Sequence, residues 1–205
     1  MKSKVLFSLF FILIFLSACK RSTGEMFDEM KNLYKKKDYE SAIKMCSKII
    51  KRNKKLQEAY YYRGFCFWEQ NKLSDALFDF EKILDMHMAA GGFRFELSSE
   101  LAELNEEARY QIPYNDALYQ KAQVEYEMGN LRNAYKDFQD LINENYEKSN
   151  CFLWLGTIML KSGDEEKACL FFYQGKESAD NDGDFANALK LLKQCDSIST
   201  KTLQR

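Results

Sequence analysis

The stretch YYYRGFCFWEQNKLSDALFDF, residues 60–80, decides the fold of this 205-residue chain. Small and apolar residues recur at the 3.6-residue period of a helix on both sides of a polar break at Asn71-Lys72. They are Tyr60, Gly64 and Phe67 before the break, and Leu73, Ala76 and Phe80 after it. The stretch therefore predicts two helices joined by a short turn, and one such hairpin needs neighbours to bury its apolar faces.

The same pattern returns in three other parts of the chain, with a period of 34 residues inside each of two pairs. The four units begin near residues 23, 57, 115 and 149. Two columns of mostly small residues mark where the helices of each hairpin approach closely. The columns are Met30, Gly64, Ala122 and Gly156, and Ala42, Ala76, Ala134 and Ala168. The predicted turns are Lys37-Asp38, Asn71-Lys72, Gly129-Asn130 and Gly163-Asp164, and the candidate helix caps after them are Ser74, Asn130 and Asp164.

These columns resemble the tetratricopeptide repeat over residues 23–90 and 115–182. The clearest matches are Leu155-Gly156 with Ala168 and Phe172, and Leu131 with Ala134 and Phe138. The chain departs from the family where Glu125 replaces an aromatic residue, and the family's proline is missing from all four units. The resemblance implies an all-α superhelical solenoid of about four helix hairpins.

The chain before and between the repeats divides by composition. We predict a signal peptide at 1–18, a lipidated tether at 19–24, repeats one and two at 25–90, an insertion at 91–114, repeats three and four at 115–182, a capping helix at 183–196 and a disordered tail at 197–205. In the insertion, a helix is expected from Ser98 or Ser99 to about Tyr110, and Pro113 starts the third repeat.

The first residues are typical of a bacterial lipoprotein signal. A basic start is followed by the apolar run Val5 to Leu16, which is shorter than the ~20 residues of a membrane-spanning helix. Leu16-Ser17-Ala18-Cys19 resembles the lipoprotein processing site, which implies cleavage before Cys19 and lipidation of its thiol. Lys20 follows the cysteine instead of Asp, so we expect the outer membrane, with the protein facing the periplasm. Ser22 and Glu25 fit a capping box, so a helix should begin close to the lipid.

Charge and motif content exclude several function classes. The formal charge of −1 falls to about −3 once Lys2 and Lys4 are removed with the signal peptide, which argues against a nucleic-acid partner. No Cys/His spacing resembles a zinc site, and no phosphate-binding glycine loop is present. His87, the only histidine, is expected on the surface near a helix end. We therefore predict no enzyme activity, metal or cofactor.

Five cysteines remain after Cys19. Two pairs of cysteines fall on neighbouring helices, Cys46 with Cys66 and Cys169 with Cys195. Within each pair, we expect the two cysteines to be offset along the helix axes by about one helical turn (~5 Å). That offset is marginal for a disulfide, so buried free thiols are the favoured prediction for these residues and for Cys151.

The resemblance also implies that the first helix of each unit lines a concave groove that holds peptide segments. The groove columns are Phe27, Lys31 and Tyr34; Tyr61, Phe65 and Trp68; Tyr119, Gln123 and Tyr126; and Leu153, Thr157 and Leu160, with Glu58, Glu69, Asp116 and Glu127 on the rim. The partner-binding residues we predict from these are Phe27, Tyr34, Tyr61, Phe65, Trp68, Tyr119, Gln123 and Tyr126. A helix apolar on all sides must be covered or must bind something.

Two alternatives stay open for this groove. It either binds a partner or is filled by the insertion through Phe93, Phe95, Leu97, Tyr110 and Ile112. If it is open, the chain is a lipid-anchored scaffold that binds another envelope protein. The alternative function is a lipoprotein that captures a soluble glycan or peptide by stacking on the same aromatic rings.

Overall fold

The computed structural model describes residues 21–90 and 105–202, with side chains up to residue 195. These ranges contain ten α-helices and no strand, which confirms the all-α prediction. The helices are α2 (Thr23–Lys35), α3 (Tyr39–Arg52), α4 (Gln57–Glu69), α5 (Leu73–Ala89), α7 (Glu106–Arg109), α8 (Tyr114–Met128), α9 (Leu131–Asn143), α10 (Lys148–Lys161), α11 (Glu165–Glu177) and α12 (Asp182–Thr202). The predicted signal peptide and Cys19 lie outside the described residues.

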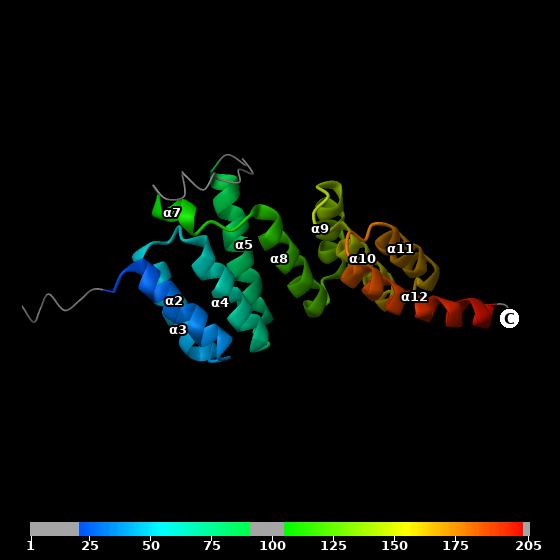
Figure 1. Cartoon of the computed structure of the whole chain (residues 1–205), viewed down its shortest axis with the longest axis horizontal. Coiled ribbons are helices and arrows are strands. Elements are labelled where there is room, and N and C mark those ends of the chain that lie inside the picture. Colours follow the sequence, from blue (N-terminus) through cyan, green and yellow to red (C-terminus); the bar gives the residue numbers. More distant parts are fainter. Residues whose placement is uncertain (1–20, 91–104, 203–205) are drawn as a thin grey trace, which may run out of the picture.

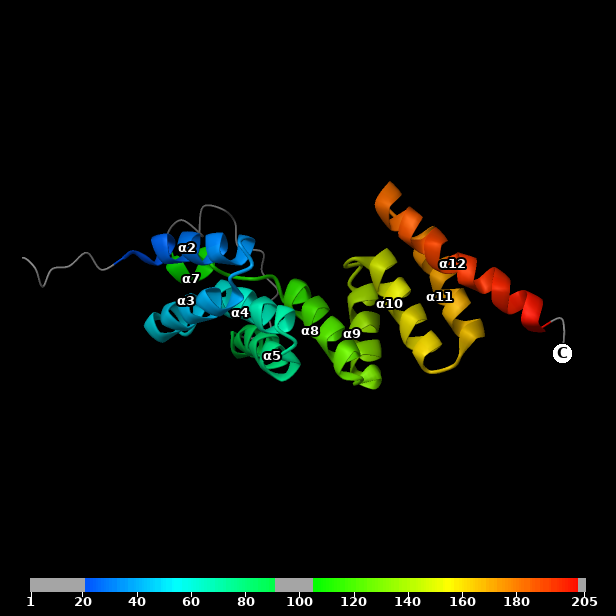
Figure 2. The same cartoon turned by 90° about the horizontal axis from the view of Figure 1, so that it is seen from below.

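Four helix hairpins stack in chain order into an elongated solenoid (Figures 1 and 2). They are α2–α3, α4–α5, α8–α9 and α10–α11, and α12 packs on α11 at the end of the stack. The third hairpin follows the second without a break, because α8 packs directly on α5. The insertion between them therefore does not interrupt the stack of helices.

The predicted turns end the first helix of each hairpin in the left-handed region of backbone space. Their φ angles are 60° at Lys37, 58° at Asn71, 83° at Gly129 and 84° at Gly163. Asp164 caps the next helix, since its side chain accepts a hydrogen bond from the Lys167 backbone N–H. Asn130 occupies an N-cap position without a side-chain bond. The prediction for Ser74 was wrong, because α5 begins one residue earlier at Leu73, immediately after the turn.

The close approach inside each hairpin follows from the small residues of the two columns, which are all fully buried or glycine. A Cβ atom added to Gly156 would overlap the Phe172 ring and lie 3.0 Å from the Ala168 carbonyl oxygen. At Gly64 the added atom would lie 3.0 Å from the Phe80 ring. The overlap at Gly156 leaves no room for a larger residue without a shift of Phe172, whereas the contact at Gly64 is tight but does not overlap.

Two of the hairpins also carry a buried ion pair between their helices. The Arg63 guanidinium donates two hydrogen bonds of 2.8 and 2.7 Å to the fully buried Asp79 carboxylate. At the corresponding place in the third repeat, the Lys121 ammonium lies 2.6 Å from Asp137 and 3.1 Å from Glu125. Glu125, which stands where an aromatic residue was expected, is therefore part of a buried charge cluster with Lys121 and Asp137.

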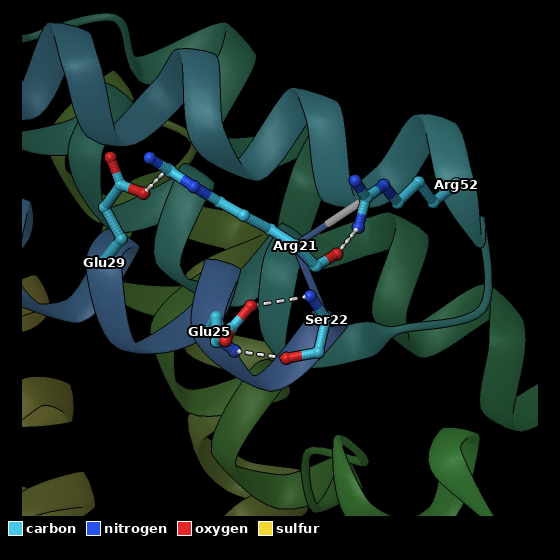
Figure 3. A network of polar contacts seen from close by, with 5 residues as sticks. All are labelled: Arg21, Ser22, Glu25, Glu29 and Arg52. Atoms are coloured by element: carbon cyan, nitrogen blue, oxygen red, sulfur yellow. Dashed lines mark hydrogen bonds and ion pairs between the residues drawn. The ribbon is translucent and has the colours of Figure 1, made fainter. Parts of the chain in front are cut away.

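The chain enters the first hairpin through a fixed segment (Figure 3). The capping box is confirmed: the Glu25 N–H donates to Ser22 Oγ at 3.2 Å, and the Ser22 N–H donates to the Glu25 carboxylate at 2.8 Å. The Arg21 side chain pairs with Glu29, and Arg52 of α3 donates a 2.6 Å hydrogen bond to the Arg21 carbonyl. Arg21 is therefore held to both helices of the hairpin.

The described end of the insertion packs against the first two hairpins. The expected helix from Ser98 or Ser99 to Tyr110 does not run unbroken, because Asn105 is extended and caps the single turn α7. The Tyr110 ring stacks on Phe27 with a centroid distance of 4.0 Å. This contact buries Phe27 in the core, where it cannot line a groove.

His87 is buried, which corrects the prediction of a surface histidine. Its Nε2 atom lies 2.8 Å from the carbonyl oxygen of Ile112, and the Ile112 N–H donates to Gln57 at 2.8 Å. The histidine thus joins the end of α5 to the segment that leads into α8. This partner comes from an insertion whose path the repeat pattern does not specify.

The C-terminal end differs from the prediction in two respects. Helix α12 runs to Thr202 instead of ending at residue 196, since no Gly or Pro interrupts the sequence there. Cys169 and Cys195 form a disulfide with a Cα–Cα distance of 5.7 Å, whereas Cys46, Cys66 and Cys151 are buried free thiols as predicted. The packing of α12 on α11 places the two bridged cysteines opposite each other on the neighbouring helices.

Candidate peptide-binding groove

A groove of about 570 Å³ lies on the inner face of the first three repeats. Its lining comes from three helices: Tyr34 of α2, Phe65, Trp68 and Glu69 of α4, and Gln120, Gln123 and Glu127 of α8. Four of the predicted partner-binding residues are among them, namely Tyr34, Phe65, Trp68 and Gln123. The volume falls in the range of ordinary ligand pockets, about 300–1,000 Å³.

Trp68 bridges the two main walls of the groove. Its indole N–H donates a 2.7 Å hydrogen bond to the Glu127 carboxylate, which joins α4 to α8. The Trp68 ring is nearly parallel to that of Phe65, with a centroid distance of 6.2 Å and an interplanar angle of 12°. Both rings are only half-buried, so part of each remains available to a ligand.

Glu69 directly follows Trp68 in the sequence and supplies the second carboxylate of the groove lining. Its Oε2 atom accepts a 3.1 Å hydrogen bond from the Tyr39 hydroxyl of α3. Glu69 and Glu127, both expected on the rim, are exposed and line the groove. The groove wall therefore combines flat aromatic surface with two carboxylates.

Tyr61 packs against the groove residue Phe65 and does not line the groove itself. Its ring packs edge-on against Phe65 at 4.8 Å and against Phe80 at 5.9 Å. Burial raises the pKa of Tyr61 to about 12, so its hydroxyl stays protonated at neutral pH. Tyr62, which we did not predict as a groove residue, extends the aromatic cluster toward Tyr34. The centroids of these two rings lie 5.5 Å apart.

The other predicted residues of the third repeat lie in a separate aromatic cluster. Trp154 of α10 donates a 3.2 Å hydrogen bond to the Tyr119 hydroxyl, and its ring lies 5.2 Å from that of Tyr126. Burial raises the pKa of Tyr119 to about 12. The Lys161 ammonium lies 4.5 Å from the centre of the Tyr126 ring. These residues fill the interface between the third and fourth repeats.

The other residues of the predicted groove columns make contacts within the protein. Lys31 forms a 2.7 Å ion pair with Glu58, and hydrogen bonding to that carboxylate raises the pKa of Lys31. Leu153 is buried, Thr157 donates a 2.8 Å hydrogen bond to the Leu153 carbonyl, and Leu160 packs against the core of the fourth repeat. The groove described above is therefore lined by residues of the first three repeats.

Sequence reasoning missed Gln120, which replaces Tyr119 as a groove residue. The stripe of α8 that faces the groove is Gln120, Gln123 and Glu127, rotated by about one residue from the predicted stripe. The spacing of these polar residues at i, i+3 and i+7 is itself a helical stripe, so a polar face was visible in the sequence.

The described end of the insertion does not fill the groove. Tyr110 packs on Phe27, and Ile112 lies between the start of α4 and the end of α5. Neither residue lines the groove. Phe93, Phe95 and Leu97 lie outside the described residues, and their part of the alternative stays a prediction.

Within residues 21–90 and 105–195, no group of three or more His, Cys, Asp or Glu side chains is arranged to hold a metal ion. Among the described helices, none combines the length and the apolar character needed to cross a bilayer. The groove lining consists of aromatic rings, side-chain amides and carboxylates on three helices.

A family model described as the tetratricopeptide repeat matches residues 116–149, which cover most of α8, all of α9 and the first two residues of α10. No curated protein sequence matches the chain. The matched segment agrees with the third predicted repeat, which begins near residue 115. The match covers one repeat, and the other three units share its arrangement of two helices joined by a short turn.

Solved structures of similar shape support the same fold. A crystal structure of MamA aligns with a TM-score of 0.55 and 14% identity, over 86% of this chain and 97% of that chain. A MamA structure from Desulfovibrio magneticus RS-1, residue 41 to the end, aligns with a TM-score of 0.60 and 17% identity, over 79% and 80%. At these identities the likeness shows the fold alone: an all-α tetratricopeptide-repeat solenoid.

Proposed function

We propose that this chain is a lipid-anchored repeat scaffold that binds a segment of another bacterial envelope protein in the groove between α4 and α8. The observation that carries the proposal is the open groove itself. Phe65 and Trp68 remain half-buried on a helix whose other face is already packed, so solvent-exposed aromatic surface is kept where a ligand can reach it. Binding of this kind requires no chemical step.

The envelope location is supported by three observations. The lipoprotein-like signal places Cys19 two residues before Arg21, which is held to the first hairpin (Figure 3). With a lipid on Cys19, the first repeat would therefore lie close to the bilayer. The Cys169–Cys195 disulfide is typical of an oxidising compartment such as the periplasm. Lys20 after the lipidated cysteine favours the outer membrane.

The partner proposal is tested by affinity purification of the tagged full-length protein from detergent-solubilised membranes. Trp68→Ala should remove a stoichiometric protein partner that the wild type retains. Phe78→Ala is the matched control, because Phe78 is 61% exposed and lies outside the groove. If both variants keep the partner, the groove is not the binding site. If no protein copurifies and glycans raise the melting temperature, the alternative of soluble-ligand capture is correct.

The anchor is tested separately by Cys19→Ser, followed by fractionation of the cells. The variant should leave the membrane fraction and lose incorporation of labelled palmitate, because diacylation and N-acylation both depend on this residue. Retention of an unlabelled Cys19→Ser variant in the membrane would contradict the lipoprotein interpretation without affecting the groove.

A further inference from the structure

The charged residues in the groove lining are of one sign. Among the residues that the structure describes, Glu69 and Glu127 line the groove and no lysine or arginine does. Beside the carboxylates, the lining includes the half-buried aromatic rings of Phe65 and Trp68, which lie within 12° of parallel. Building on the proposed function, we propose that the groove selects a segment carrying an arginine side chain, with lysine as the weaker alternative.

Both carboxylates are positioned by the fold before any ligand arrives. Glu127 accepts from the Trp68 indole at 2.7 Å, and Glu69 accepts from the Tyr39 hydroxyl at 3.1 Å. Both hydrogen bonds use the Oε2 atom, and a carboxylate has acceptor sites on each oxygen. Each group can therefore receive a guanidinium N–H while it keeps its existing bond.

Two lysines on the adjoining helices are engaged by other groups. Lys31 is paired with Glu58 at 2.7 Å, beyond the Tyr34 end. Lys161 lies over the Tyr126 ring in the next aromatic cluster. The groove thus keeps two negative charges that a ligand with a positive charge would complement.

The aromatic rings favour arginine over lysine. A planar guanidinium stacks on an aromatic face and donates hydrogen bonds from its edge, whereas an ammonium acts as a point charge. Phe65 and Trp68, which are half-buried and within 12° of parallel, supply aromatic surface in the same lining as the carboxylates. The side-chain amides of Gln120 and Gln123 supply donors and acceptors for the backbone of an extended segment.

The test passes a random hexapeptide library, capped at both termini, over immobilised Cys19→Ser protein and sequences the retained peptides by mass spectrometry. We expect arginine to be enriched about fivefold over the input, which corresponds to about 1 kcal/mol, and lysine to be enriched less. The enrichment should fall with added salt, since the groove is open to solvent.

The decisive comparison is between two double variants with the same change in charge. Glu69→Gln/Glu127→Gln should abolish the arginine enrichment, and Glu81→Gln/Glu166→Gln, which changes exposed acids outside the groove, should leave it intact. Circular dichroism melts of both variants verify the fold.

The outcomes separate this inference from the proposed function. Peptides retained through Trp68 without a basic residue would overturn the arginine inference and leave the groove as a binding site. Retention no greater than that of Trp68→Ala would overturn both. Enrichment that survives Glu69→Gln/Glu127→Gln would place the cation elsewhere and also contradict the inference.

Discussion

Removal of the Arg63 side chain should be among the most destabilising single changes in this solenoid. Asp79 is fully buried, and its two hydrogen bonds of 2.7 and 2.8 Å both come from Arg63. Arg63→Leu leaves that carboxylate without its cation inside the second hairpin. Breaking one side of a buried ion pair costs about 3–5 kcal/mol, which is a large fraction of the about 5–15 kcal/mol that stabilises an ordinary domain.

The fourth repeat supplies the compensating change. At the same two columns, 92 residues later, it has Leu155 and Phe171, both buried. A pair of apolar residues therefore fits this position of the hairpin. Arg63→Leu/Asp79→Phe should lie within about 1 kcal/mol of the wild type, because apolar replacement of a whole buried ion pair is often neutral.

The assay is urea unfolding of a soluble form, residues 20–205, followed by circular dichroism at 222 nm for the wild type, both single variants and the double variant. Lys44→Leu is the control, since Lys44 pairs with Glu40 on the exposed surface of α3. The reasoning is refuted if Arg63→Leu changes stability no more than this control. It is also refuted if the double variant loses the sum of the two single effects.

Three further predictions concern packing, the disulfide and pH. Gly156→Ala should lower stability by about 1–3 kcal/mol in thermal melts, despite better helix propensity, because the added methyl group overlaps Phe172; a gain would contradict the close approach. Reduction of Cys169–Cys195 releases a crosslink worth about 3.5 kcal/mol by chain entropy, so amide exchange of α12 should accelerate while that of α4 stays unchanged. Burial raises the pKa of Asp137, so its contribution to stability is greatest below the unfolded pKa of about 3.9 and is lost as the pH rises through the folded value. The advantage of the wild type over Asp137→Asn in urea unfolding should therefore shrink as the pH rises above about 4.

Local rules account for most of the agreement between sequence and structure. The hairpins follow from the helical period and the columns of small residues, as at Gly156 and Ala168, because both depend on contacts within one repeat. The turns at Gly129 and Gly163 follow in the same way, since a positive φ angle is a property of one residue. The Ser22–Glu25 capping box needs only four consecutive residues.

Tertiary packing decided what the repeat pattern leaves undetermined. The rotation of α8 on α5 turns Gln120 into the groove in place of Tyr119, and a shift of one residue on a helix moves a side chain by about 100°. The burial of Phe27 depends on Tyr110, a residue far along the chain in an insertion without repeat symmetry. The Cys169–Cys195 disulfide depends on the axial position of α12 relative to α11.

The sequence by itself therefore determined the helices, the order of the hairpins and the aromatic character of α4, because these depend on residue type at a regular spacing. Only the tertiary structure decided which aromatic residues line the groove. Tyr61 and Trp68 lie on the same helix, yet Tyr61 is held against Phe80 while Trp68 reaches Glu127 across the groove. That difference arises from the relative rotation of stacked helices, which is set by the combined packing of several repeats.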